Sequence, residues 1–160
     1  MLLDGVDHIA TLTTDTDRLH RFYLDVFDAT VSLDQAAGPG MRFSVVDLGP
    51  HAHLNVFEID GNTEASSDRP MFQRGRIDHL GLHAASDAAF DEIRRRLMDR
   101  GATDGFVTDF GPALSVWFVD PDGLEGEVCI ENRDAIPGVS NPPGTPAARY
   151  HPTSAGATPA

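Results

Sequence analysis

Residues 77–102 read IDHLGLHAASDAAFDEIRRRLMDRGA and give the clearest indication of the fold. An earlier stretch, VDHIATLTTDTDRLHRFYLDVF at residues 6–27, has the same plan. Each begins with an apolar residue, Asp, His and a second apolar residue, and His79 follows His8 by 71 positions. The same offset aligns two sets of apolar residues at helical spacing. The chain therefore contains an internal repeat, and each half is predicted to open with a strand and an amphipathic helix.

Short β-branched or alternating segments follow each predicted helix. They are residues 30–33, 41–48 and 53–59 in the first half, and 103–108, 114–119 and 125–131 in the second. The sequence Asp120-Pro121-Asp122-Gly123 indicates a tight turn that joins the last two strands into a hairpin. Each half thus reads βαβββ, which predicts an α+β fold built from two such modules.

The length and composition indicate one compact domain followed by a tail. The chain has 160 residues, of which 41% are hydrophobic, enough for a single core. Residues 134–160 are rich in Pro and Gly and lack apolar periodicity, so we expect an extended tail there. The domain is then residues 1–133, with module one at 4–60, a polar linker at 61–75 and module two at 76–133.

Charge and cysteine content exclude several classes of function. The formal net charge of −13 repels nucleic-acid phosphates and anionic lipids. All twelve basic residues are Arg, so Schiff-base and Walker-type chemistry lack their lysine. The single cysteine, Cys129, cannot form an internal disulfide, and no apolar run is long enough for a signal peptide or a bilayer span. We expect a soluble, cytoplasmic protein that binds a small molecule, not nucleic acid or membrane.

Strand alternation places three metal-binding side chains on one side of the predicted sheets. Leu80 should face the second helix, which sends His79 to the opposite surface, and by the repeat His8 takes that surface too. In the last strand the apolar neighbours of Glu127 face the helix, which leaves Glu127 on the open side. Two sheets curled around their open faces would bring His8, His79 and Glu127 together.

Two imidazoles and one carboxylate form a ligand set that suits an open metal site. We expect a divalent ion, which could be Fe, Mn, Zn, Ni or Co, with positions left for two neighbouring oxygens of a substrate. The competing interpretation is that His8 and His79 are ordinary hydrogen-bonded strand histidines and that Glu127 is a solvated charge.

These features resemble the vicinal oxygen chelate superfamily of glyoxalases, extradiol dioxygenases and bleomycin-binding proteins. The most specific part is FVDPDGLEGEVCIE at residues 118–131, where a Glu comes four residues after the turn Gly. The resemblance covers about residues 4–132 and implies a curled mixed sheet around an open cup, with His8, His79 and Glu127 as metal ligands. It implies a metal-dependent lyase, isomerase or ring-cleaving dioxygenase, and we favour a homodimer, in which the cup closes within one chain or between two.

One position departs from the superfamily pattern. Members with a fourth protein ligand or a carboxylate base take it from the last strand of the first module, which here offers His53 or Asn55 on the open face. The sequence does not decide which of the two, His53 or Asn55, takes the position of that ligand or base. The missing Glu weakens a glyoxalase-type proton shuttle and favours dioxygenase-like or other lyase chemistry. His53 is a candidate ligand or catalytic base, and His83 is a candidate acid–base group lining the cup.

The remaining candidates concern the substrate. Arg42 is the only basic residue in a predicted inner strand and is a candidate for binding a substrate anion, while Asn55 and Trp117 are candidates for the pocket wall. Specificity is expected to reside in loops at 34–40 and 61–75. His20 is expected on the exposed side of the first helix.

The competing function is a metal-free protein that sequesters a cationic small molecule, as the resemblance to bleomycin-resistance proteins implies. The net charge of −13 suits a cationic ligand.

Overall fold

The computed structural model describes residues 2, 5–66 and 77–138. The chain divides into two compact units. The first comprises the residues up to Asp68 together with the turn Pro121–Gly123, and the second comprises Arg69–Asp120 and the residues from Leu124 onward. In the part of the chain that the structure describes, no helix has the length and apolar character to cross a membrane.

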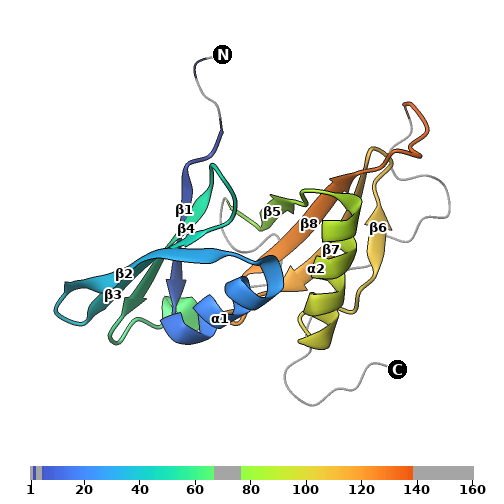
Figure 1. Cartoon of the computed structure of the whole chain (residues 1–160). Coiled ribbons are helices and arrows are strands. Elements are labelled where there is room, and N and C mark those ends of the chain that lie inside the picture. Colours follow the sequence, from blue (N-terminus) through green and yellow to red (C-terminus); the bar gives the residue numbers. More distant parts are fainter. Residues whose placement is uncertain (1, 3–4, 67–76, 139–160) are drawn as a thin grey trace. The chain divides into compact units, whose positions relative to one another are not determined.

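The first unit holds one helix and a four-stranded mixed sheet (Figure 1). Its elements are β1 (His8–Thr13), α1 (Thr16–Phe27), β2 (Thr30–Gly38), β3 (Met41–Asp47), β4 (His53–Ile59) and the short 3-10 helix η1 (Glu64–Ser66). The strand order is β1-β4-β3-β2, with β1 parallel to β4 and the other pairs antiparallel.

The second unit repeats this plan. Its elements are β5 (Leu80–His83), α2 (Asp87–Asp99), β6 (Val107–Asp109), β7 (Ala113–Val119) and β8 (Glu125–Glu131). The order is β5-β8-β7-β6, and β5 is again parallel to its neighbour β8. The prediction of an α+β fold with two βαβββ modules is confirmed. The cup remains a prediction.

Each helix begins where the sequence places a capping side chain. The Asp15 carboxylate accepts a hydrogen bond from the Arg18 amide at 2.9 Å, and the Ser86 hydroxyl accepts one from the Ala89 amide at 3.1 Å. These bonds satisfy amides that have no partner inside the helix. The two caps fix where α1 and α2 begin.

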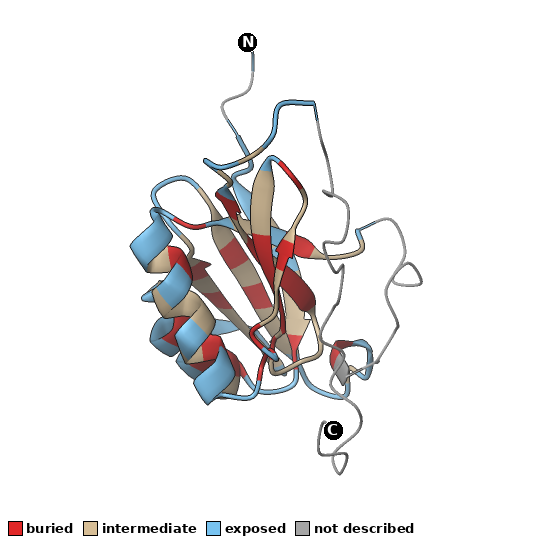
Figure 2. Cartoon of the chain, turned by 90° about the vertical axis from the view of Figure 1, so that its right-hand side faces the viewer, coloured by how far each residue is buried: buried red, intermediate tan, exposed pale blue. Residues whose placement is uncertain are grey.

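Each unit buries one face of its sheet under its helix. In the first unit Leu19 and Val26 of α1 and Leu54 and Val56 of β4 are all almost fully buried. In the second unit, Leu97 of α2 and Val128 of β8 are likewise almost fully buried. Figure 2 shows buried residues recurring along the strands, while the outer side of the helix is exposed. Burial of each such side chain stabilises the fold by about 1.5–3 kcal/mol.

Three expectations from the sequence need correction. Strand β2 continues to Gly38, so the expected loop at 34–40 is mostly strand. Strand β6 begins at Val107 instead of residue 103, because Thr103 is in a turn in which its hydroxyl accepts a hydrogen bond from the Gly105 amide at 3.1 Å. His20 is buried, not exposed, and its Nε2 contacts the Ser44 hydroxyl at 2.8 Å.

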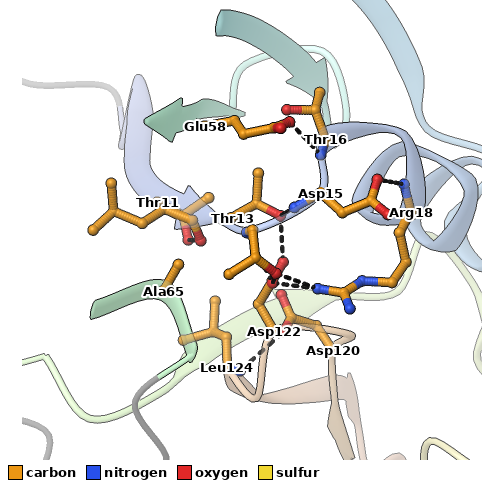
Figure 3. A network of polar contacts seen from close by, with 12 residues as sticks. Thr11, Thr13, Asp15, Thr16, Arg18, Glu58, Ala65, Asp120, Asp122 and Leu124 are labelled. Atoms are coloured by element: carbon orange, nitrogen blue, oxygen red, sulfur yellow. Dashed lines mark hydrogen bonds and ion pairs between the residues drawn. The ribbon is translucent and has the colours of Figure 1, made fainter. Parts of the chain in front are cut away.

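The predicted turn before β8 has a role that the sequence did not reveal. The Asp122 carboxylate accepts hydrogen bonds from the hydroxyls of Thr13 at 2.6 Å and Thr14 at 3.1 Å, and it forms an ion pair with Arg18 (Figure 3). Nearby, the Thr16 amide donates to Glu58 at 2.8 Å. These bonds hold the junction between β1 and α1 in the first unit.

The domain boundaries remain predictions. Within the expected linker, residues 61–66 contain η1, whereas 67–75 lie outside the described residues. Of the expected tail, only 134–138 are described, and Ile136 there is exposed.

Candidate functional site

The second unit brings two of the three predicted metal ligands together. His79 Nε2 lies 3.5 Å from Glu127 Oε1. The other ring nitrogen, Nδ1, donates to the Asp78 carboxylate at 2.9 Å, and the Ser115 hydroxyl donates to Glu127 Oε2 at 2.7 Å. Each of the two side chains is therefore oriented by a partner on the side away from the other. This leaves Nε2 and Oε1 facing each other.

The facing atoms have the chemistry of a metal-binding pair. When Nδ1 of His79 donates to Asp78, the neutral ring carries its lone pair on Nε2. A lone pair and a carboxylate oxygen of Glu127 at 3.5 Å attract a cation placed between them. Metal–nitrogen bonds of about 2.0–2.1 Å put neighbouring donors of a tetrahedral ion roughly 3.3 Å apart. The residues therefore fit a divalent metal.

The first unit repeats the arrangement around His8. Its Nδ1 donates to the Asp7 carboxylate at 2.8 Å, the counterpart of the bond between His79 and Asp78. This hydrogen bond lowers the pKa of Asp7, so the carboxylate is ionised at neutral pH. Ligating histidines are commonly oriented by such a carboxylate. His8 belongs to the first unit and Glu127 to the second, and their convergence on one ion stays a prediction.

Strand pairing settles the register that the sequence left open. In the parallel pairs, Ala10 lies opposite Asn55 and Gly81 lies opposite Glu127, and Ala10 and Gly81 are equivalent in the repeat. Asn55, not His53, is thus the counterpart of Glu127. Its Oδ1 is buried and accepts no hydrogen bond from any residue that the structure describes.

His53 lies two residues before that position and directly opposite His8. The two rings stack with their centroids 5.7 Å apart, and His53 Nε2 lies 4.0 Å from Asp7 Oδ2. Together these three residues place ligand atoms within 4.8 Å of one another.

His83 and Cys129 lie further along the open face of the second sheet. They are paired across β5 and β8, two pairs beyond the pair of Gly81 and Glu127. His83 is exposed, whereas Cys129 is half-buried. Burial, and then the charge of Glu127, raise the pKa of the Cys129 thiol to about 11, which leaves it almost wholly protonated at neutral pH.

The predicted substrate residues differ in their surroundings. Trp117 is buried and is the register partner of Glu127. Its ring meets the ring of His79 edge to face, with the two centroids 4.7 Å apart, so Trp117 lines the pair of His79 and Glu127. Arg42 forms ion pairs with Asp34 at 2.6 Å and with Asp17 of α1 at 2.8 Å. These contacts raise the pKa of Arg42 and occupy its guanidinium.

The sequence-based search missed three orienting residues, Asp7, Asp78 and Ser115. The signal for the first two was present, because Asp precedes His in both copies of the repeat. No sequence pattern pointed to Ser115, which is brought near Glu127 by the pairing of β7 with β8.

The sequence model of the Glyoxalase/Bleomycin resistance protein/Dioxygenase superfamily matches residues 5–128. The chain belongs to this superfamily, whose name joins enzymes with drug-binding proteins. A search of curated proteins finds no match.

Solved structures support the fold. A glyoxylase/bleomycin resistance protein/dioxygenase domain from Frankia sp. EAN1pec superimposes with a TM-score of 0.70 and 23% identity, covering 81% of this chain and 99% of that one. An antibiotic-binding protein from Streptomyces sp. CB03234 superimposes with a TM-score of 0.55 and 21% identity, and the match covers 82% of this chain and 99% of that one. A fosfomycin resistance protein from Listeria monocytogenes, complexed with Mn(II) and sulfate, superimposes with a TM-score of 0.60 and 15% identity. The match covers 84% of this chain and 98% of that one. At these identities the likeness concerns the fold.

Proposed function

We propose that the protein is a divalent-metal-dependent enzyme that acts on a small substrate with two neighbouring oxygens. The proposed ligands are His8, His79 and Glu127. The observation that carries the proposal is the repeated Asp–His hydrogen bond, at 2.8 Å in the first unit and 2.9 Å in the second. Two histidines at equivalent positions, each with Nδ1 hydrogen-bonded to the preceding Asp, support a ligand role, because ligating histidines are commonly held by such a carboxylate.

A bound ion would act as a Lewis acid on the substrate oxygens. The protein's own residues supply the rest. Asp7 and Asp78 hold the two imidazoles in the orientation and tautomer that ligation needs. Ser115 fixes one oxygen of Glu127, and the Trp117 ring packs against the ring of His79.

Two of the remaining candidates fit a role beside the ion. His83 lies on the same sheet face as Glu127, two pairs further along β5, and is proposed as the acid–base group. Asn55 has a buried carbonyl oxygen without a hydrogen bond from the described residues, so it is proposed to accept one from the substrate. We leave Arg42 out of the proposed site, because Asp34 and Asp17 hold its guanidinium. His53 stacks on His8 beside Asp7, which suits a ligand role better than proton transfer.

We propose that the reaction is a ring-cleaving dioxygenation or a lyase reaction, and not one that depends on a glyoxalase-type proton shuttle. The position equivalent to Glu127 in the first module is the amide Asn55, which cannot accept a proton as a carboxylate base does. We propose a homodimer, with the metal site closed within one chain or between two.

The test is the metal content of the protein purified without chelators. We expect close to one divalent ion per chain in the wild type, and a loss of at least tenfold in metal affinity on His79→Ala. His51→Ala, in an exposed turn, is the matched control and should leave the affinity unchanged. Unchanged metal affinity in His79→Ala would reject the ligand assignment.

A second candidate function is metal-free binding of a cationic drug. The formal net charge of −13 favours it, and one structural neighbour is an antibiotic-binding protein. Titration of chelator-treated protein with a cationic glycopeptide separates the two. Tight binding without metal, unaffected by His79→Ala, would favour sequestration over catalysis.

A further inference from the structure

We infer that Asp7, His8 and His53 form a metal-binding site that is complete within the first unit. One carboxylate oxygen and one ring nitrogen from each histidine lie within 4.8 Å of one another. His79 and Glu127 contribute nothing to this set. The site is thus distinct in two of its three donors from the proposed catalytic one.

The geometry needs little adjustment to hold an ion. Asp7 Oδ2 is 2.8 Å from His8 Nδ1 and 4.0 Å from His53 Nε2. Donors around a tetrahedral zinc ion are separated by roughly 3.3 Å, between these two values. Small side-chain rotations of Asp7, which is exposed, would bring all three donors to that spacing.

The backbone fixes the two histidines relative to each other. His8 and His53 are register partners in the parallel pair of β1 and β4, and the His53 amide donates to the Asp7 carbonyl at 3.1 Å. Donors mounted on paired strands are more precisely placed than donors on loops. The stacked rings, 5.7 Å between centroids, are the consequence of this pairing.

The surroundings favour a cation. Asp7 and His53 line a surface cavity of about 370 Å³, together with Asp47 and His51. No arginine is among the lining residues, so nothing positively charged opposes an incoming ion. Asp47 is the register partner of His53 on β3 and adds a second negative charge on this side.

The donor set indicates the class of metal. Two imidazole nitrogens and one carboxylate oxygen suit Zn²⁺, Co²⁺, Ni²⁺ or Cu²⁺ better than Mg²⁺ or Ca²⁺, which prefer oxygen ligands alone. With three protein ligands, at least one position stays open for water. Because both sites need His8, they are alternative positions for one ion, and the first unit can capture metal by itself.

The experiment uses the full chain and Co²⁺, whose visible absorption reports coordination by nitrogen. The double variant His79→Ala/Glu127→Gln removes the donors of the second unit. We expect it to bind about one Co²⁺ per chain, because the donors of the first unit remain. Adding His53→Gln to this background should weaken binding by about tenfold or more. Asp91→Asn, an exposed carboxylate on α2 that does not line this cavity, is the control and should change nothing.

The inference would be overturned if the double variant bound no Co²⁺, if His53→Gln left its affinity unchanged, or if Asp91→Asn weakened binding as much as His53→Gln did. Asp7→Asn offers a second variant should His53→Gln alter the circular dichroism spectrum. The outcome is separable from that of the proposed enzyme site. If His79→Ala/Glu127→Gln matches the wild type in affinity and His53→Gln does not, the enzyme site fails and the site in the first unit stands.

Discussion

Asn55 occupies in the first sheet the position that Glu127 occupies in the second. Each lies opposite a small residue on the parallel neighbouring strand, Ala10 for Asn55 and Gly81 for Glu127. The two modules share their backbone plan and their Asp–His pair but differ in this one donor. The first module therefore lacks the carboxylate that would give the proposed metal a fourth protein ligand.

Asn55→Glu should restore that ligand. We expect the affinity for Mn²⁺ or Co²⁺ to rise roughly tenfold or more, because a carboxylate replaces a neutral amide beside the ion. Without metal, the same variant should be less stable by about 1–3 kcal/mol, because a charge is placed where a buried amide oxygen was. Calorimetric titration and urea unfolding measure the two effects. Asn55→Gln is the neutral control, and a variant Glu that left metal affinity unchanged would contradict the proposed site.

Gly126→Ala should destabilise the second unit. A Cβ at Gly126, on β8 beside Glu127, would overlap the ring of Phe118, which is almost fully buried and cannot move away. Overpacking of this kind costs about 1–3 kcal/mol in urea unfolding. Gly81→Ala is the control, since its Cβ would meet Glu127 only at an ordinary contact distance of 3.6 Å. Equal stability of the two variants would show that Phe118 has room to shift.

His20 should make stability depend on pH. Burial lowers its pKa below the ordinary value of 6.5, so the folded state favours the neutral ring. The unfolded state takes up the proton at about pH 6.5, so this stability is complete above that pH and is lost as the pH falls below it. Relative to His20→Gln, the wild type should lose up to about 1.4 kcal/mol per pH unit between pH 6.5 and the lowered folded pKa. Exposed His51→Gln should show no such difference, and parallel curves for wild type and His20→Gln would refute the burial effect.

Asp122→Ala should loosen the start of α1. The carboxylate, whose side chain is only 5% exposed, holds the hydroxyls of Thr13 and Thr14 and the guanidinium of Arg18. Its removal leaves these donors without their acceptor, at a cost of about 1–3 kcal/mol. Amide hydrogen exchange should accelerate in the first turn of α1, next to Asp15. Exchange that stayed as slow as in the wild type would show that the Asp15 cap alone fixes this helix end.

The repeat and the hydrophobic pattern were enough to predict the fold. Strands β4 and β8 have the predicted bounds, because each alternates between a buried face under a helix and an open face. Strand β2 was predicted too short. It is an edge strand exposed along most of its length, so beyond Leu33 it carries no apolar alternation and is defined only by its pairing with β3.

The site was less predictable than the fold. The imidazoles and Glu127 followed from strand alternation, and the structure shows His79 facing Glu127. The register of Asn55 against His53 required the actual strand pairing, because a shift by one pair changes which residue faces Ala10. The burial of His20 was hidden as well, because it depends on packing of α1 against Ser44 of β3.

The most direct test of the central claim is an anomalous-scattering map from crystals grown with Mn²⁺ or Co²⁺. We expect a peak bonded to His79 Nε2, Glu127 Oε1 and a ring nitrogen of His8, from the same chain or from its partner. A map with no peak beside His79 and Glu127 at saturating metal would contradict it.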